Sequence, residues 1–132
     1  MSDKKRILLI DNEEGLCRMM EQVLLDNGYL ARGYTSPRKA VEEFRAGAWD
    51  LVISDIKMPG DIDGIGLYHW VRHERPALAR RFLFVTGDVH DPALTGLLEA
   101  SPDRFITKPF QVRDYLEVVR GMLERDAAAD CA

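Results

Sequence analysis

Short runs of consecutive apolar residues alternate along the chain with segments of helical periodicity. The clearest runs are 7–10 (Ile-Leu-Leu-Ile), 51–53 (Leu-Val-Ile) and 82–85 (Phe-Leu-Phe-Val), each bounded by polar or turn residues. Unbroken apolar runs of this length are typical of parallel strands that are buried on both faces. Weaker strand patterns at 29–34 and 104–107 complete a set of five.

Helical patterns separate these strands. Apolar residues recur at helical spacing over 16–24 and 112–123, and polar residues beside Pro or Gly mark helix starts at Ser36, Asp63 and Asp91. Strand and helix therefore alternate five times. This order predicts an α/β fold with an open, doubly wound, five-stranded parallel sheet and five helices.

Length and charge limit the classes of function. With 132 residues, 46% of them hydrophobic, the chain suits one domain, expected over 1–126, with a frayed Ala-rich tail at 127–132. A net charge of −4 gives no positive field for a nucleic acid, and no apolar run is long enough for a membrane span. We expect a cytoplasmic protein without nucleic-acid or membrane partners. The two cysteines, Cys17 and Cys131, have neither the pattern of a disulfide framework nor a metal-ligand spacing, and Cys17 is predicted to be a core residue.

Polar residues follow four of the five strands. They are Asp11, Asp55, Thr86 and Lys108. In open parallel sheets, ligands bind outside the carboxyl ends of the strands. We therefore expect these four side chains to form one site.

The acidic side chains of this edge would repel a phosphate unless a divalent cation lay between them. Mg²⁺ prefers oxygen ligands, and Asp11 and Asp55 are the candidates to supply carboxylates. With the cation present, Asp55 is the best placed nucleophile for phosphoryl transfer. Lys108 would balance charge on the phosphoryl oxygens, and the hydroxyl of Thr86 would donate a hydrogen bond to them.

Four segments carry a more specific pattern, in order along the chain. They are 7–13 (ILLIDNE), 50–59 (DLVISDIKMP) with Asp63-Gly64, 84–87 (FVTG) and 105–110 (FITKPF). In these residues the chain, from Lys5 to about Arg125, resembles the receiver domain of bacterial two-component response regulators.

The resemblance implies a flavodoxin-like fold with strand order 2-1-3-4-5. It also implies that a sensor histidine kinase or histidine phosphotransfer protein phosphorylates Asp55. The implied Mg²⁺ ligands are Asp11, Asn12, Asp55 and the backbone carbonyl of Lys57.

The same resemblance assigns switch roles to Thr86 and Phe105. In the family, a hydroxyl residue moves toward the phosphoryl group and an aromatic residue turns inward behind it. This change reshapes the face of the fourth helix, fifth strand and fifth helix, which binds a downstream protein target. That face is also a candidate surface for a homodimer.

Two departures from the family pattern stand out. Asn12 replaces a second acidic residue on the metal, so we predict weaker Mg²⁺ binding than in an Asn12→Asp variant, with Glu13 compensating through a water. The loop after Asp55 is one residue longer than usual, which loops tolerate.

Simpler interpretations exist for several of these residues. Asp11 and Asn12 are also good helix caps, and Phe105 reads equally as plain core. His69 and His73 lie four apart without a third ligand, which favours surface positions. The basic stretch 72–81 reads as a solvated connection.

Two other functions remain as alternatives. A pseudo-receiver would bind partners without phosphorylation because Asn12 weakens the metal site. A small flavin or phosphate-ester protein on this fold fits less well, because acids stand where a phosphate loop needs glycines and hydroxyls. A stand-alone regulator and a receiver within a larger protein are both compatible with the sequence.

Overall fold

A five-stranded parallel sheet with helices on both faces forms the molecule, and its strand order is β2-β1-β3-β4-β5. The computed structural model describes residues 4–58, 60, 62–87, 92, 96 and 105–131, with only the backbone for 125–131. The strands are β1 (Arg6–Ile10), β2 (Leu30–Tyr34), β3 (Leu51–Asp55), β4 (Phe82–Thr86) and β5 (Phe105–Thr107). The described helices are α1 (Glu14–Asp26), α2 (Pro37–Ala46), α3 (Gly64–Glu74), α4 (Pro76–Ala79) and α6 (Val112–Cys131). The predicted fold class and strand order are confirmed.

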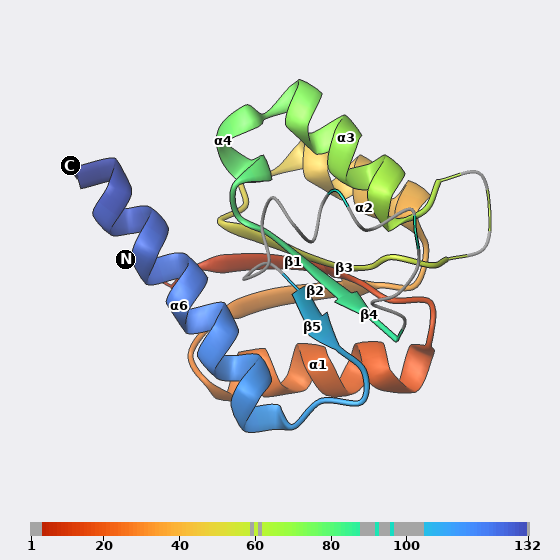
Figure 1. Ribbon diagram of the computed structural model, residues 1–132, viewed down its shortest axis with the longest axis horizontal. Helices are drawn as coiled ribbons and strands as arrows, with labels where there is room; N and C mark the ends of the chain where they lie inside the picture. The colour runs from red at the N-terminus through yellow and green to blue at the C-terminus, as the bar shows by residue number, and fades with distance from the viewer. Residues whose placement is uncertain are drawn as a thin grey trace.

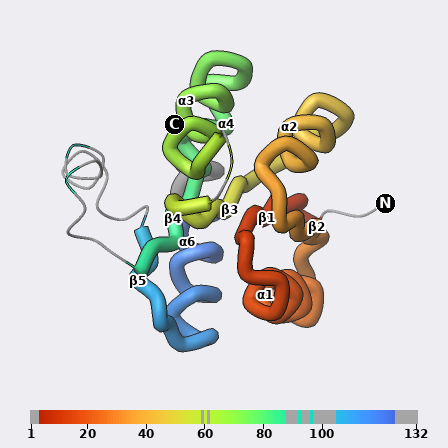
Figure 2. Tube along the Cα trace, turned by 90° about the vertical axis from the view of Figure 1, so that its right-hand side faces the viewer, coloured from red at the N-terminus to blue at the C-terminus, as the bar shows by residue number. Residues whose placement is uncertain are grey.

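The helices form two layers. Figures 1 and 2 show α1 and α6 on one face of the sheet and α2, α3 and α4 on the other. Successive strand residues point to opposite faces of the sheet. Ile7 and Leu9 pack with α1 and α6, whereas Leu8 and Ile10 pack with α2 and α3. All four of these side chains are buried, as expected for a strand that is covered on both faces. Cys17 of α1 is also buried, which confirms it as a core residue.

Local chemistry explains where the helices begin. Ser36 is the N-cap of α2 with Pro37 as its first residue, and Asp63 caps α3 by accepting a hydrogen bond from the amide of Gly66 at 2.8 Å. Both starts are as predicted. The helix predicted to begin at Asp91 lies outside the described residues.

The basic stretch 72–81 differs from the expected solvated connection. Pro76–Ala79 form one helical turn, α4, and its Leu78 and Ala79 are buried against the α2 and α3 layer. Burial of these two apolar side chains outweighs the solvation of the neighbouring arginines. The prediction of a solvated connection was therefore wrong for Leu78 and Ala79, whereas Arg72 and Arg80 are exposed.

The last helix extends further than the apolar pattern suggested. α6 continues to Cys131, and its described core residues are Tyr115, Val119, Met122 and Leu123. The frayed tail expected at 127–132 stays a prediction. Among the described residues, no helix has the length and apolar character that a bilayer crossing requires.

Candidate phosphoacceptor site

Strand register brings the predicted site residues to one edge of the sheet. Ile10 of β1 pairs with Ser54 of β3, so Asp11 and Asp55 follow at the same level. Asp55 is itself level with Val85 of β4, which places Thr86 one residue further along the neighbouring strand. Parallel pairing thus gathers residues that are far apart in the sequence.

Three hydrogen bonds continue the sheet pattern beyond the strand ends. The amide of Asp11 donates to the Tyr34 carbonyl at 3.0 Å, and that of Lys108 donates to the Thr86 carbonyl at 2.7 Å. The amide of Ile56 donates to the Val85 carbonyl at 3.2 Å. The backbone of the site is therefore part of the rigid sheet.

Lys108 is the centre of the side-chain cluster. Its Nζ lies 3.0 Å from Asp11 Oδ2 and 3.1 Å from Asp55 Oδ2, and a third carboxylate, Glu13 Oε1, lies at 3.8 Å. Asp11 and Asp55 are 1% and 7% exposed, so both carboxylates are largely removed from water. The structure thus brings together three of the predicted residues, Asp11, Asp55 and Lys108.

Burial sets the electrostatics of the cluster. Burial raises the pKa of Asp55, and the neighbouring Asp11 raises it too, while Lys108 acts in the opposite direction without cancelling the effect. Burial alone would lower the pKa of Lys108, but its contacts with Asp11 and Asp55 outweigh this and raise it. Lys108 therefore remains a cation at neutral pH, which suits it to neutralise an added anionic group.

The two carboxylate oxygens of Asp11 have different partners. Its Oδ1 accepts a hydrogen bond from the amide of Glu13 at 2.9 Å, so it helps to shape the start of α1, although Glu13 itself is the N-cap. Asp11 Oδ2 is buried and, among the described residues, has no well-aligned hydrogen-bond donor; its contact with Lys108 is an ion pair. A buried carboxylate oxygen with unused acceptor capacity fits a hard cation such as Mg²⁺.

The other two metal ligands that the family resemblance implies lie in exposed loops. Asn12 and Lys57 are both exposed, in the loops after β1 and β3. Within the described part of the chain, no three His, Cys, Asp or Glu side chains gather closely enough to hold a metal. His69 and His73 are exposed on α3, as predicted. Any cation here would need ligands beyond side-chain carboxylates.

Two residues to which the sequence analysis assigned no role support the backbone of Asp55. The hydroxyl of Ser54 donates to the backbone carbonyl of Asp55 at 2.8 Å. Gly64 packs against that same carbonyl, and its amide donates to the Ile56 carbonyl at 2.9 Å. A single polar residue within the apolar run of β3 was the available signal for Ser54, whereas the Gly64 contact depends on tertiary packing.

The two predicted switch residues lie on β4 and β5. Thr86 is buried at the end of β4, and Phe105 is half-buried at the start of β5. The ring of Phe105 stacks on Phe84 with centroids 5.0 Å apart and planes 21° apart, and Phe84 in turn contacts Tyr68 of α3 at 5.3 Å. Phe105 is thus connected to the α3 layer through an aromatic chain.

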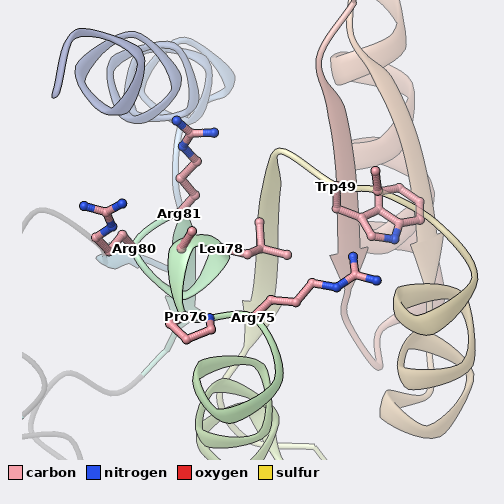
Figure 3. A pocket seen from close by; sticks show the side chains of 8 residues that line it. Trp49, Arg75, Pro76, Leu78, Arg80 and Arg81 are labelled. Carbon is pink, nitrogen blue, oxygen red and sulfur yellow. The ribbon is translucent and has the colours of Figure 1, made fainter. Parts of the chain in front are cut away.

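A cavity of about 380 Å³ lies at the opposite end of the sheet, before β3 and β4. Figure 3 shows its lining, which includes Trp49, Arg75, Leu78 and Arg81. Arg75 donates to the Gly47 carbonyl at 2.7 Å and stacks over Phe44 at 4.5 Å. Arg75 therefore has a packing role. None of the predicted site residues lines this cavity, so it is separate from the site around Lys108.

Comparison with known families gives a match over most of the chain. The sequence model of the response regulator receiver domain matches residues 7–120. Transcriptional regulatory protein PcoR of Escherichia coli is 31% identical over 124 residues, which cover 92% of this chain and 52% of PcoR. Sensor kinase CckA of Brucella abortus is 29% identical over 127 residues, which cover 95% of this chain and 13% of CckA. The chain thus spans about half of the first relative and much less of the second.

Solved structures match along nearly the whole length. A CheY-like response regulator receiver domain protein from Methanospirillum hungatei is 26% identical with a TM-score of 0.86, over 96% of this chain and 99% of that one. The non-phosphorylated HemR receiver domain from Leptospira biflexa is 28% identical with a TM-score of 0.80, over 91% and 94% of the two chains.

Proposed function

The chain belongs to the response regulator receiver domain family, and from that premise we propose that Asp55 accepts a phosphoryl group with the help of Mg²⁺. The observation that supports this most directly is the contact of Lys108 Nζ with both Asp11 and Asp55 at the carboxyl edge of the sheet. Burying two carboxylates beside one lysine costs more than apolar packing would, and the hydrogen bond that the Glu13 amide donates to Asp11 accounts for only one of the four carboxylate oxygens.

In the proposed reaction, a carboxylate oxygen of Asp55 attacks the phosphorus of a phosphohistidine on the partner. The new O–P bond forms as the N–P bond breaks, and the histidine nitrogen takes up a proton. Lys108 turns from the free carboxylate to a phosphoryl oxygen, and the hydroxyl of Thr86 donates to another. Ser54 and Gly64 hold the Asp55 backbone in place during this step.

The proposed Mg²⁺ ligands are Asp11, Asp55, the amide oxygen of Asn12 and the backbone carbonyl of Lys57. When bound, the cation offsets negative charge on the carboxylates and the incoming phosphoryl group. The buried Oδ2 of Asp11, which forms an ion pair with Lys108 but has no well-aligned hydrogen-bond donor among the described residues, supports this assignment.

The signal would leave the site through Thr86 and Phe105. A shift of Thr86 toward the phosphoryl group changes the space behind it, and the stacked pair of Phe105 and Phe84 borders the α3 layer. We propose that a sensor histidine kinase or phosphotransfer protein supplies the phosphoryl group. A downstream protein then binds the altered face near β5 and α6. The same face is the proposed homodimer surface.

Incubation with acetyl phosphate, with and without Mg²⁺, tests this proposal. We expect Mg²⁺-dependent addition of one phosphoryl group by intact-mass measurement, and none in Asp55→Asn. Lys108→Met should react far more slowly while retaining its fold by circular dichroism. Equal labelling of the wild type and Asp55→Asn would contradict the proposal.

A pseudo-receiver is the second candidate because Asn12 is neutral and exposed. One missing unit charge about 4 Å from a divalent cation costs up to about 8 kcal/mol at an effective dielectric near 20, and less where water screens it. We expect Asn12→Asp to bind Mg²⁺ more tightly in a calorimetric titration. If the wild type stays unmodified while Asn12→Asp reacts, the pseudo-receiver is favoured instead.

A further inference from the structure

Glu13 lies at the mouth of the site and shares its cation. Its Oε1 is 3.8 Å from Lys108 Nζ, the nitrogen that Asp11 and Asp55 contact at 3.0 and 3.1 Å. Three carboxylates therefore face one positive charge, and Glu13 is the outermost of them. Its side chain is 64% exposed, whereas that of Asp55 is only 10% exposed.

The backbone of Glu13 takes part in the start of α1, whereas its carboxylate does not. Its amide donates to Asp11 Oδ1 at 2.9 Å, and it forms the N-cap of α1 without using its own carboxylate as a cap. The carboxylate of Glu13 is thus anchored close to the site and has no competing hydrogen bond within α1. This leaves it able to turn toward a cation without disturbing the helix.

A second observation points to a ligand at this position. Asp11 is 1% exposed, and its Oδ2 forms an ion pair with Lys108 but has no well-aligned hydrogen-bond donor among the described residues. The neighbouring Asn12 contributes no charge. A divalent cation would therefore meet only two buried carboxylates, with Glu13 as the nearest additional negative side chain that the described contacts reveal.

We infer that Glu13 acts as the outer carboxylate of the cation site and restores part of the negative charge that Asn12 does not provide. The inference rests on the proposed function. Its contribution is electrostatic and acts across water, since Glu13 does not form a closed metal-ligand cluster with Asp11 and Asp55 in this structure. Glu13 is accordingly a positioning residue, not a catalytic one.

The test is a Mg²⁺ titration followed by backbone amide shifts in NMR, which needs no phosphorylation. Glu13→Gln removes the charge and keeps the side-chain size, so we expect Mg²⁺ to bind about three- to tenfold more weakly, as for a partly screened charge pair. Glu14→Gln is the matched control, because Glu14 is the next residue, exposed in the first turn of α1. It should change the affinity less than twofold.

The Asn12→Asp background separates the outcomes further. If Glu13 compensates for Asn12, Glu13→Gln should weaken Mg²⁺ binding less in the Asn12→Asp variant than in the wild type. We expect the fold-change in affinity to be less than half as large. Equal affinities for Glu13→Gln and Glu14→Gln would overturn the inference and leave the proposed function standing. No saturable Mg²⁺ binding in either the wild type or Asn12→Asp would overturn the Mg²⁺-dependent function itself, and the inference with it.

Discussion

Replacing Gly64 by alanine should destabilise the protein although alanine favours helices. Gly64 begins α3 and packs directly on the end of β3. A Cβ atom there would collide with the Asp55 carbonyl oxygen and would lie 2.8 Å from Ile56 Cα. Both neighbours are backbone atoms of the sheet edge, so neither can yield by a simple side-chain rotation.

The size of the effect follows from two opposing contributions. Overpacking of a buried position costs about 1–3 kcal/mol, while the lower unfolded-state entropy of alanine returns about 0.4–1 kcal/mol. We expect a net loss of about 1–2 kcal/mol in the free energy of unfolding, equivalent to a fall of about 4–8 °C in Tm for a domain of this size.

Urea unfolding followed by circular dichroism measures this loss, and Gly15→Ala is the matched control. Gly15 lies near the start of α1 with no atom within 4 Å of a built Cβ, so the same chemical change should stabilise the protein there. Gly64→Ala should also slow phosphorylation, because the Asp55 carbonyl must move. If Gly64→Ala were as stable as Gly15→Ala, the close contact with the Asp55 carbonyl would be refuted.

Two further predictions concern buried polar groups. Because burial raises the pKa of Asp55 above its usual 3.8, Asp55→Asn should stabilise the fold at neutral pH. This gain in stability should disappear as the pH falls through the raised pKa and below 3.8, where the carboxyl group is protonated in both the folded and the unfolded state. Urea unfolding at several pH values measures the gain. A gain that increased toward acid pH would contradict the prediction. The buried hydroxyl of Tyr115 donates to the Met20 carbonyl at 3.3 Å, so Tyr115→Phe should cost about 0.5–1.5 kcal/mol. The cost should be equal at pH 6 and 9, because burial raises the pKa of Tyr115 and the phenol stays neutral; unchanged stability would contradict this role for the hydroxyl.

The strands and the candidate site could be predicted because both follow from short-range patterns. Apolar runs identify strands that are covered on both faces, and parallel strands bring their carboxyl ends together. Asp11, Asp55 and Lys108 were therefore predictable as neighbours before any distance was known. Strand order came from the family resemblance, since periodicity alone does not fix which strands pair.

Other features depend on tertiary contacts that a sequence pattern does not reveal. The turn α4 exists because Leu78 and Ala79 find an apolar layer to bury against, while the local composition is dominated by arginine. The role of Gly64 arises from a close approach between α3 and β3. The position of Glu13 within reach of Lys108 likewise depends on how the loops after β1 and β5 meet.

The hydrogen bond from the Gly64 amide to the Ile56 carbonyl has a consequence for how this protein can diversify. It closes the connection between β3 and α3 at its base, so both ends of that connection are fixed whatever its length. Residues can then be inserted or removed between these ends without displacing β3, so the longer loop that the family resemblance predicts would leave Asp55 in place. Segments exchanged at this point between related proteins should therefore change the surface beside Asp55 while leaving the position of Asp55 in the sheet unchanged.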